Sequence, residues 1–343
     1  MIENKARIVQ TSPRAAIPGG EVLIECSGFD AVETRHWNCF IGENECRLVG
    51  ASKSRILALV GAGLPSGEQN VRVEIGELSA NNASLIVGSE LADELHPVAN
   101  PAFDPTDGSL FVSRSGSRGQ QMPVSIFRIT PEGDLDAFSG DITNPTGFAF
   151  DGKGKLFVSS RLNGTVYRID DFKEARPFAE DLGVATGIAF DKAGDLYVGN
   201  RSGVIYKVSP GGLVTSWATH EPSVSAYHLA FGPDQMLYVS GPTVSSYDTV
   251  VRFDRWGKST VFFRGLGRPQ GLAFDTDGYL YVAASYRGRR GVVRITPDGS
   301  SAEIVVAGMN VVGLCFGPDG QMIVATTDAI YSVPIRIKGL LPA

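Results

Sequence analysis

The sequence lacks a long apolar run, a basic surplus and a cysteine framework, and each absence narrows what the chain can be. No uncharged apolar stretch reaches the roughly eighteen residues that a membrane-spanning helix needs. The four cysteines are too few and too scattered for a disulfide scaffold, and no C-x-x-C pair occurs, so we expect reduced thiols. The first residues carry no apolar secretory run, which predicts a cytoplasmic protein.

The charge and the composition point to a soluble globular protein. The formal net charge is −6, whereas a nucleic-acid-binding surface requires a basic patch, so we expect no nucleic-acid partner. The chain contains 41 glycines and 43% hydrophobic residues, a composition typical of a large core interrupted by many turns. We also expect no membrane partner, and the sequence leaves the oligomeric state open.

An internal repeat dominates the sequence. Six copies of one phrase occur, of which Pro145-Thr146-Gly147-Phe148-Ala149-Phe150-Asp151 is typical. The spacings between the last phenylalanines of successive copies are 47, 40, 41, 43 and 42 residues, which is about the length of one propeller blade. These anchoring phenylalanines are Phe103, Phe150, Phe190, Phe231, Phe274 and Phe316.

Each copy reads as four short strands separated by Asp/Gly turns, which is typical of antiparallel hairpins. Six such sheets around a channel form a propeller whose strand edges are short and protected. The last copy has no clear fourth strand after Ile330 to Pro334. We therefore expect residues 89–95 to supply the outer strand of the final blade and close the ring.

The first part of the chain does not carry the repeat. It contains short apolar strands between Gly/Pro turns, such as Glu21 to Cys26 after Pro18-Gly19-Gly20, and the alternating strand Val71 to Ile75. This pattern fits a small β-sandwich. We expect an all-β protein with an immunoglobulin-like sandwich over residues 1–88 and a six-bladed β-propeller over residues 89–343.

The two parts resemble known families. Residues 6–88, with Gly28-Phe29, Phe40-Ile41-Gly42 and Pro65-Ser66-Gly67, resemble the immunoglobulin-like IPT/TIG domain. Residues 97–334 resemble the NHL-repeat and gluconolactonase-like propellers of the regucalcin superfamily, because each copy approximates G-h-A-F-D followed by G-x-L-Y-V. The second resemblance implies a ligand site at one mouth of the channel. It also implies a divalent metal that assists lactone hydrolysis, held by Glu, Asn and Asp.

The sequence does not show the usual ligands for that metal. The position after each second strand, where the resemblance implies an acid, holds none; it is occupied by Arg114, Ser160, Asn200, Gly241, Ala284 and Thr326. Hard cations prefer several carboxylate oxygens. Whether any metal is bound therefore stays open at this point.

Strand alternation predicts which residues face the channel mouth. The residue three before the anchoring phenylalanine is glycine in four copies, whereas the other two copies carry Asn100 and His228. Tyr227 and His228 could act as a general acid/base pair. The further residues expected to bind the ligand at this mouth are Arg114, Thr146, Arg161, Thr186, Asn200, Arg201 and Gln270. The alternative is a water-filled channel whose polar groups satisfy one another.

We expect arginines to supply most of the charge at this mouth. Arg161 and Arg201 occupy matching positions in adjacent copies, and guanidinium groups suit carboxylates or phosphates. Arg114, Arg118, Arg268, Arg287, Arg289 and Arg290 are expected at the same end. The alternative is that arginines bond loop carbonyls or face solvent, which suits Arg289 and Arg290 best. Acidic residues after each first strand place the negative charge at the other end, where we expect exposed Asp–Arg pairs.

Two functions follow from these expectations. The first is a gluconolactonase-like propeller that binds a small polar or anionic molecule at the channel mouth and could hydrolyse a lactone or ester, with His228 as acid/base. The second is a non-catalytic propeller that recognises a ligand or a protein, with the sandwich as a second contact surface.

Overall fold

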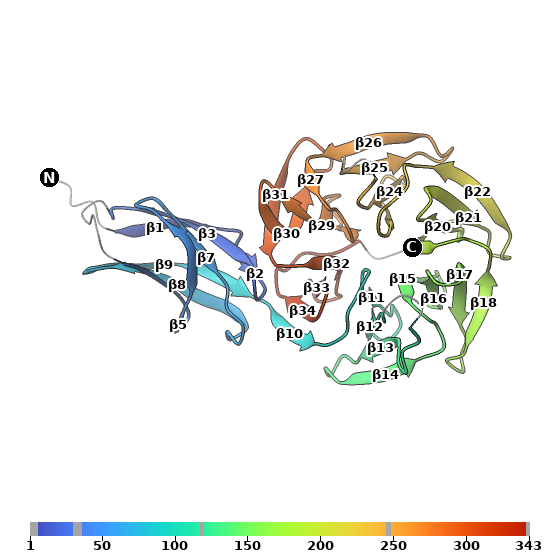
Figure 1. Ribbon diagram of the computed structural model, residues 1–343, viewed down its shortest axis with the longest axis horizontal. Coiled ribbons are helices and arrows are strands. Elements are labelled where there is room, and N and C mark those ends of the chain that lie inside the picture. The colour runs from blue at the N-terminus through green and yellow to red at the C-terminus, as the bar shows by residue number, and fades with distance from the viewer. Residues whose placement is uncertain (1–5, 30–35, 117–119, 245–247, 341–343) are drawn as a thin grey trace.

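The computed structural model describes residues 6–29, 36–116, 120–244 and 248–340. These residues form strands and no helix, and none of them belongs to a helix that could cross a membrane. Figure 1 shows a two-sheet N-terminal part beside a ring of sheets. The chain is therefore all-β, as the strand patterns predict.

The N-terminal part consists of two sheets that share one apolar core. One sheet has the order β1 (Arg7–Ser12), β3 (Glu21–Ser27), β7 (Arg55–Leu59), β6 (Arg47–Ala51). The other has the order β2 (Ala15–Ala16), β9 (Leu78–Val87), β8 (Gly67–Ile75), β4 (Trp37–Ile41), β5 (Asn44–Glu45). Alternate residues such as Val22, Ile24 and Cys26 point into the core between the sheets. This alternation is the reason the segment folds as two packed sheets.

Backbone hydrogen bonds join the N-terminal part to the propeller. Strand β2 pairs in parallel with β9 and also with β31 (Ala302–Ala307) of the fifth blade. Gly20 makes this approach possible, because an added Cβ there would lie 2.5 Å from the carbonyl oxygen of Ala307. The two parts thus share a continuous sheet (Figure 1).

Six four-stranded blades follow the repeat. The first four consist of β11 (Ala102–Phe103), β12 (Leu110–Ser113), β13 (Ile126–Ile129), β14 (Leu135–Ser139); β15 (Pro145–Phe150), β16 (Leu156–Ser160), β17 (Thr165–Ile169), β18 (Ala175–Ala179); β19 (Ala185–Phe190), β20 (Leu196–Asn200), β21 (Val204–Val208), β22 (Val214–Thr219); and β23 (His228–Phe231), β24 (Leu237–Ser240), β25 (Thr249–Phe253), β26 (Ser259–Arg264). In the fifth blade the innermost strand is split into β27 (Leu266–Gly267) and β28 (Leu272–Phe274), followed by β29 (Leu280–Tyr286), β30 (Arg289–Ile295) and β31.

The sixth blade closes the ring with a strand from far earlier in the chain. It consists of β32 (Val311–Phe316), β33 (Met322–Thr326), β34 (Ile330–Val333) and, as its outer strand, β10 (Ser89–Ala92). Glu90 lies opposite Tyr331 in the register of β10 and β34. The predicted closing strand is confirmed.

The anchoring phenylalanines pack between blades. Phe190, for example, contacts Phe157 of the preceding blade edge to face at 5.0 Å between ring centroids. The same contact joins Phe111 to Phe150, Tyr197 to Phe231, Tyr238 to Phe274 and Tyr281 to Phe316. Such aromatic pairs add specific packing to the apolar burial, so the repeat encodes one interface per blade.

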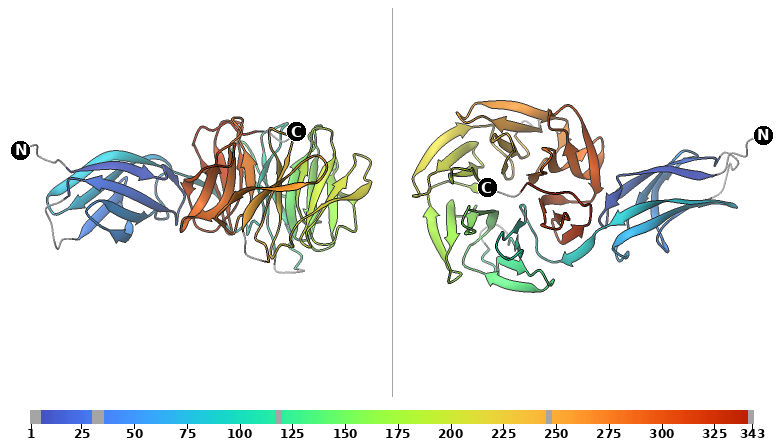
Figure 2. Two further views of the ribbon diagram at one scale, coloured as in Figure 1. Left: turned by 90° about the horizontal axis from the view of Figure 1, so that it is seen from above. Right: turned by 180° about the vertical axis from the view of Figure 1, so that it is seen from behind.

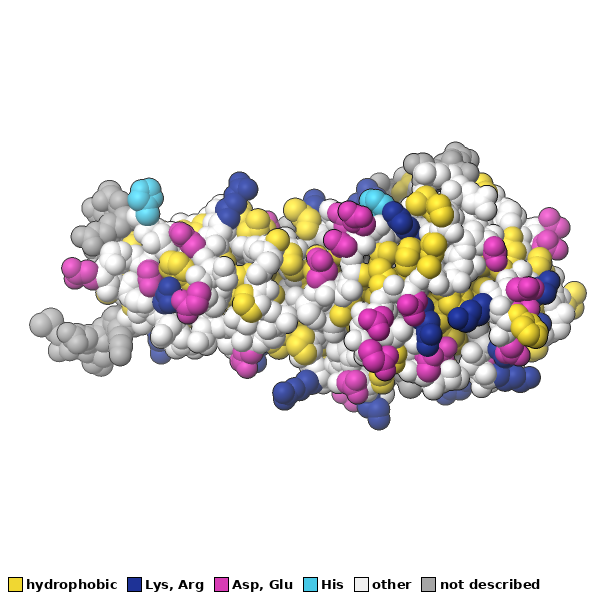
Figure 3. Space-filling view, turned by 90° about the horizontal axis from the view of Figure 1, so that it is seen from below, with side chains coloured by type: hydrophobic (Ala, Val, Ile, Leu, Met, Phe, Trp, Pro, Cys, Tyr) yellow, Lys and Arg dark blue, Asp and Glu magenta, His cyan; other side chains and the backbone are white. Residues whose placement is uncertain are grey.

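The aspartates after the first strands close turns rather than form the expected ion pairs. The Asp151 carboxylate accepts hydrogen bonds from the backbone amides of Lys153 and Lys155. Asp191 and Asp275 do the same in their blades. The ion pair of the first blade uses Asp107, which contacts Arg128 at 2.5 Å. Figure 3 shows the molecule from the side, at right angles to the view of Figure 1, and acidic and basic side chains are intermixed on that surface.

The innermost strands touch backbone to backbone at glycine. The Gly187 amide donates to the carbonyl of Tyr227 in the next blade at 2.8 Å. An added Cβ at Gly187 would lie 2.5 Å from that oxygen, and one at Gly313 would lie 2.5 Å from the oxygen of Ala99. We call this level of the channel, formed by Gly147, Gly187, Gly271 and Gly313 with Asn100 and His228, the glycine waist.

Replacing Gly187 by alanine tests this close contact. We expect Gly187→Ala to lower the free energy of unfolding by about 1–3 kcal/mol, because backbone of the neighbouring blade must move. Gly152→Ala is the matched control, since nothing lies within 4 Å of its added Cβ. Denaturant unfolding measures both, and equal effects would show that the waist is not tightly packed.

Candidate functional site

Two separate cavities lie toward opposite ends of the propeller, and residues of the glycine waist line the larger one. The larger has a volume of about 900 Å³ and is lined by the inner strands and the turns that follow them. The smaller, of about 560 Å³, is lined by loops that enter the inner strands and by loops that follow second strands. We call them the aromatic cavity and the arginine cavity, and no residue lines both.

The arginine cavity holds part of the predicted mouth. Arg114 follows β12 and Arg161 follows β16, and both line this cavity. Each arginine comes directly after the second strand of its blade, so the repeat itself brings them to the same end of the ring. The sequence argument predicted this end for both residues.

The electrostatics of the arginine cavity favour an anion. Burial lowers the pKa of Arg161, and the positive charge of Arg201 lowers it further. The Nε atom of Arg114 and the Oγ atom of Ser115 are buried, and neither has a hydrogen-bond partner among the residues that the structure describes. Buried donors without partners cost free energy, and both residues belong to the wall of this cavity.

Other predicted arginines take structural roles or lie elsewhere. Arg201 is exposed, and its Nε donates to the carbonyl of Ser223 at 3.3 Å. Arg289 donates to the carbonyl of Ser12 at 2.8 Å and so holds the N-terminal part, while Arg290 contacts the sulfur of Met309. Arg118 lies outside the described residues.

His228 lies in the other cavity. Its side chain is buried and lines the aromatic cavity, away from Arg114 and Arg161. Burial lowers the pKa of His228 to about 4, so the imidazole is neutral at pH 7. The sequence analysis expected His228 and the arginines at the same mouth of the channel. The structure places His228 in one cavity and Arg114 and Arg161 in the other.

Asn100 joins blades instead of facing a ligand freely. Its Nδ2 donates to the carbonyl of Leu272 at 2.9 Å, and its Oδ1 accepts from the amide of Leu314 at 3.0 Å. An added Cβ at Gly271 would lie 1.9 Å from that Oδ1, so glycine makes room for the amide. Asn100 thus connects the first blade to the fifth and sixth.

The remaining predicted residues are engaged with backbone groups. Thr146 donates to the carbonyl of Asn144 and Thr186 to that of Gly199. The Oδ1 of Asn200 accepts from the Ser202 amide within its own turn. These contacts match the alternative in which polar groups of the channel satisfy one another.

Tyr227 and Gln270 do not line either cavity. Tyr227 packs in the core between the third and fourth blades, where burial raises its pKa and its hydroxyl has no partner. Because adjacent residues of an extended chain point to opposite sides, Tyr227 and His228 do not form an acid/base pair. Gln270 is half-buried, and its backbone N–H donates to the carbonyl of Ala283.

Several residues of the arginine cavity escaped the sequence analysis as ligand contacts. They are His96, Ser115, Gln120 and Thr327. His96 has a positive φ of 49°, and its Nδ1 lies 3.1 Å from the carbonyl of Thr327 and 3.7 Å from Asp328. These residues lie outside the repeated phrase, so no periodic signal marks them.

The residues do not fit the metal that the resemblance implies. Among the described residues no group of three or more His, Cys, Asp or Glu side chains could hold a metal ion. The positions after the second strands supply arginine at the arginine cavity instead of carboxylate. Hard cations need oxygen ligands, usually with negative charge, so we derive no step through a metal.

Sequence comparisons leave the family unassigned. No protein-family model matches the chain, and no curated protein matches it.

Solved structures match the fold. A gluconolactonase from Xanthomonas campestris is 18% identical, with a TM-score of 0.60 over 71% of this chain and 88% of that protein. A calcium-binding regucalcin from Agrobacterium tumefaciens is 19% identical, with a TM-score of 0.59 over 74% and 96%. An auxiliary nutrient-binding protein from Bacteroides thetaiotaomicron is 13% identical, with a TM-score of 0.55 over 96% and 97%.

These likenesses show the fold alone. The chain has the β-propeller fold that gluconolactonase and regucalcin share, as the repeat predicts. The nutrient-binding protein spans nearly the whole chain, so its fold includes a counterpart of the N-terminal part.

The burial of His228 predicts a pH dependence of stability. Its pKa is about 4 in the folded protein against 6.5 for an ordinary histidine. The unfolded chain therefore binds more protons between these values, so stability falls as the pH falls from 6.5 to 4, by at most about 1.4 kcal/mol per pH unit. We expect His228→Phe to reduce this slope in denaturant unfolding, whereas the same change at the exposed His36 leaves it intact. Equal slopes in all three proteins would contradict the burial of a neutral imidazole.

Proposed function

We propose that this protein is a ligand-binding propeller that holds a small anionic molecule, such as a sugar acid or another small carboxylate, in the arginine cavity. The observation that carries the proposal is that two arginines from adjacent blades, Arg114 and Arg161, line the same cavity. Ser115 also belongs to the wall of this cavity. Guanidinium groups form short, strong charge-assisted hydrogen bonds with carboxylates.

Desolvation supports an anion over a neutral ligand. The pKa of Arg161 is lowered by burial and by the charge of Arg201, which means that this environment disfavours the charged guanidinium. An anion restores the lost favourable charge interaction. The volume of about 560 Å³ admits a molecule of the size of a sugar acid.

We propose further that the N-terminal part is an immunoglobulin-like module of the IPT/TIG type. Its two sheets with a common core, and the Gly/Pro turns between them, support this assignment. In a recognition protein this module would be a second contact surface. It would be held in a fixed orientation by the pairing of β2 with β31.

Removing the guanidinium groups tests anion binding. We expect titration calorimetry with gluconate to show that the double change Arg114→Gln and Arg161→Gln lowers affinity about 100-fold or more, because each charge-assisted hydrogen bond contributes about 1.5–3 kcal/mol. Affinity of the unchanged protein should also fall as salt rises.

The control is Arg255→Gln, which removes an exposed arginine stacked on Trp256 in an outer hairpin. Its affinity should equal that of the unchanged protein. Unchanged affinity in the double variant, or equal losses in control and double variant, would contradict the proposal. Failure of gluconate alone is separated from failure of the site by repeating the titration with citrate and inorganic phosphate.

A second candidate function is hydrolysis of a lactone or ester in the same cavity. The observation in its favour is His96, whose Nδ1 is oriented by Thr327 and Asp328 while the ring lines the arginine cavity. An imidazole oriented in this way can act as a general base toward water. This role falls to His96 and not to His228, because only His96 lies beside the arginines.

Replacing His96 separates binding from catalysis. If the protein hydrolyses gluconolactone, His96→Gln should lower kcat by about 100-fold or more while leaving gluconate affinity within a few-fold, since general base catalysis contributes on this scale. A pH-stat assay measures the rate. If hydrolysis persists in His96→Gln, His96 is not the general base. If the unchanged protein does not hydrolyse the lactone, the hydrolase candidate is contradicted and the binding proposal is unaffected.

A further inference from the structure

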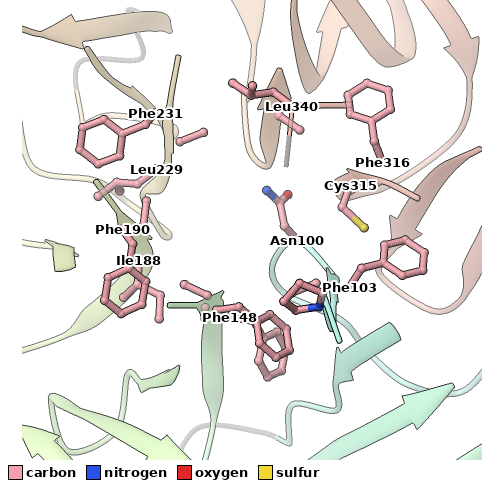
Figure 4. Close-up of a pocket in the computed structure, with 18 of the residues that line it drawn as sticks. Asn100, Phe103, Phe148, Ile188, Phe190, Leu229, Phe231, Cys315, Phe316 and Leu340 are labelled. Atoms are coloured by element: carbon pink, nitrogen blue, oxygen red, sulfur yellow. The ribbon is translucent and has the colours of Figure 1, made fainter. Parts of the chain in front are cut away.

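The aromatic cavity is a large apolar space at the end of the channel opposite the arginines. Its volume of about 900 Å³ lies within the range of cavities that hold small organic ligands. Its walls come from all six inner strands, and Figure 4 shows Phe103, Phe148, Phe190, Phe231 and Phe316 around the space. An apolar molecule placed there would be removed from water on most sides, which is the main favourable contribution to binding of such molecules.

The His228 imidazole is a polar group of this cavity without a partner. His228 is 4% exposed, and within the described chain its ring makes no hydrogen bond. Asn100 also lines the cavity, but both ends of its amide are occupied by Leu272 and Leu314. The imidazole of His228 is therefore the group at this level that can still bond to a ligand.

The charges around the aromatic cavity favour a neutral ligand. With a pKa of about 4, His228 carries no charge at pH 7, so it offers one N–H donor and one bare nitrogen. Asp104 and Asp151 at the turns are engaged with backbone amides of their own turns. Lys153 and Lys192 lie at the same rim, so neither sign of charge dominates the entrance.

The C-terminal segment narrows the entrance. The amide of Leu340 donates to the carbonyl of Phe274 at 2.8 Å, and Leu340 itself lines the cavity (Figure 4). The amide of Thr276 donates to the carbonyl of Lys338, which fixes the same segment along the rim. Figure 2 shows this end of the chain at one axial end of the propeller.

We propose that the aromatic cavity is a second binding site, which takes a compact neutral apolar molecule with one hydrogen-bonding oxygen directed at His228. The aromatic walls supply affinity, and the single imidazole selects for a carbonyl or hydroxyl group. This site is independent of the anion site, because the two cavities share no lining residue.

Two fluorescent probes test the proposal. One is a neutral aminonaphthyl ketone, and the other is pyrene, a hydrocarbon without polar atoms. We expect both to bind the full-length protein, and we expect His228→Phe to weaken the ketone about tenfold while changing pyrene affinity less than twofold. Equal effects on the two probes would overturn the role of His228, and no binding of either probe would overturn the site.

A charge at the entrance locates the probes. Leu340→Glu should weaken both probes about tenfold, because the change places a carboxylate at the rim of the cavity. Leu213→Glu is the matched control, since Leu213 is 69% exposed on another part of the propeller. Equal affinities of the two variants would show that the probes bind elsewhere. Thermal unfolding of both variants distinguishes a lost site from a lost fold.

Cys315 provides a direct footprint. It lines the cavity and is partly exposed, whereas Cys26, Cys39 and Cys46 are buried in the N-terminal part. Burial raises the pKa of the Cys315 thiol, so the reaction with N-ethylmaleimide is followed at alkaline pH, where bound ketone should slow it at least fivefold. An unchanged reaction rate would contradict the location. The variant Arg114→Gln with Arg161→Gln should show the same protection as the unchanged protein, so this site and the anion site can fail separately.

Discussion

The close contact of the innermost strands at the glycine waist is the constraint on which the rest of the propeller depends. Gly187 and Gly313 allow neighbouring backbones to approach to distances that no Cβ would tolerate. Asn100 reinforces this level by bonding to the fifth and sixth blades at once. The propeller offers two cavities of different chemistry, one lined by phenylalanines and one by arginines, and no residue lines both.

The repeat distributes this chemistry in a regular way. The loops that follow second strands carry Arg114 and Arg161 at one end of the ring. The inner strands supply interblade aromatics and walls of the aromatic cavity. The aspartates at the far turns accept hydrogen bonds from backbone amides, as Asp151 does. Lys153 and Lys192 lie beside Asp104 and Asp151 at the aromatic cavity, so both signs of charge are present there. One end of the ring thus suits an anion and the other an apolar molecule. The pairing of β2 with β31 fixes the N-terminal part beside this arrangement.

Much of the fold could be predicted from the sequence, because the phenylalanine spacing reports one blade per copy and the missing last strand requires a partner such as β10. The end of the ring that carries Arg161 and Arg201 also followed from strand alternation. The environment of His228 did not, because the sequence cannot show on which side of the waist a side chain leaves the inner strand. Asn100 was predicted to contact a ligand. In the structure its side-chain amide forms hydrogen bonds with the fifth and sixth blades, and Gly271 leaves space for it because it has no Cβ. His96 and Ser115 meet only in three dimensions and carry no periodic signal.

The central claim is that the propeller carries a proposed anion site and a proposed apolar site in two cavities that share no lining residue. Anomalous diffraction from crystals soaked with selenate and 1-bromonaphthalene tests it most directly, since selenium and bromine are distinguished at their own absorption edges. The account predicts selenium beside Arg114 and Arg161, and bromine among the phenylalanines near His228. Both elements in one cavity, or selenium beside His228, would contradict it.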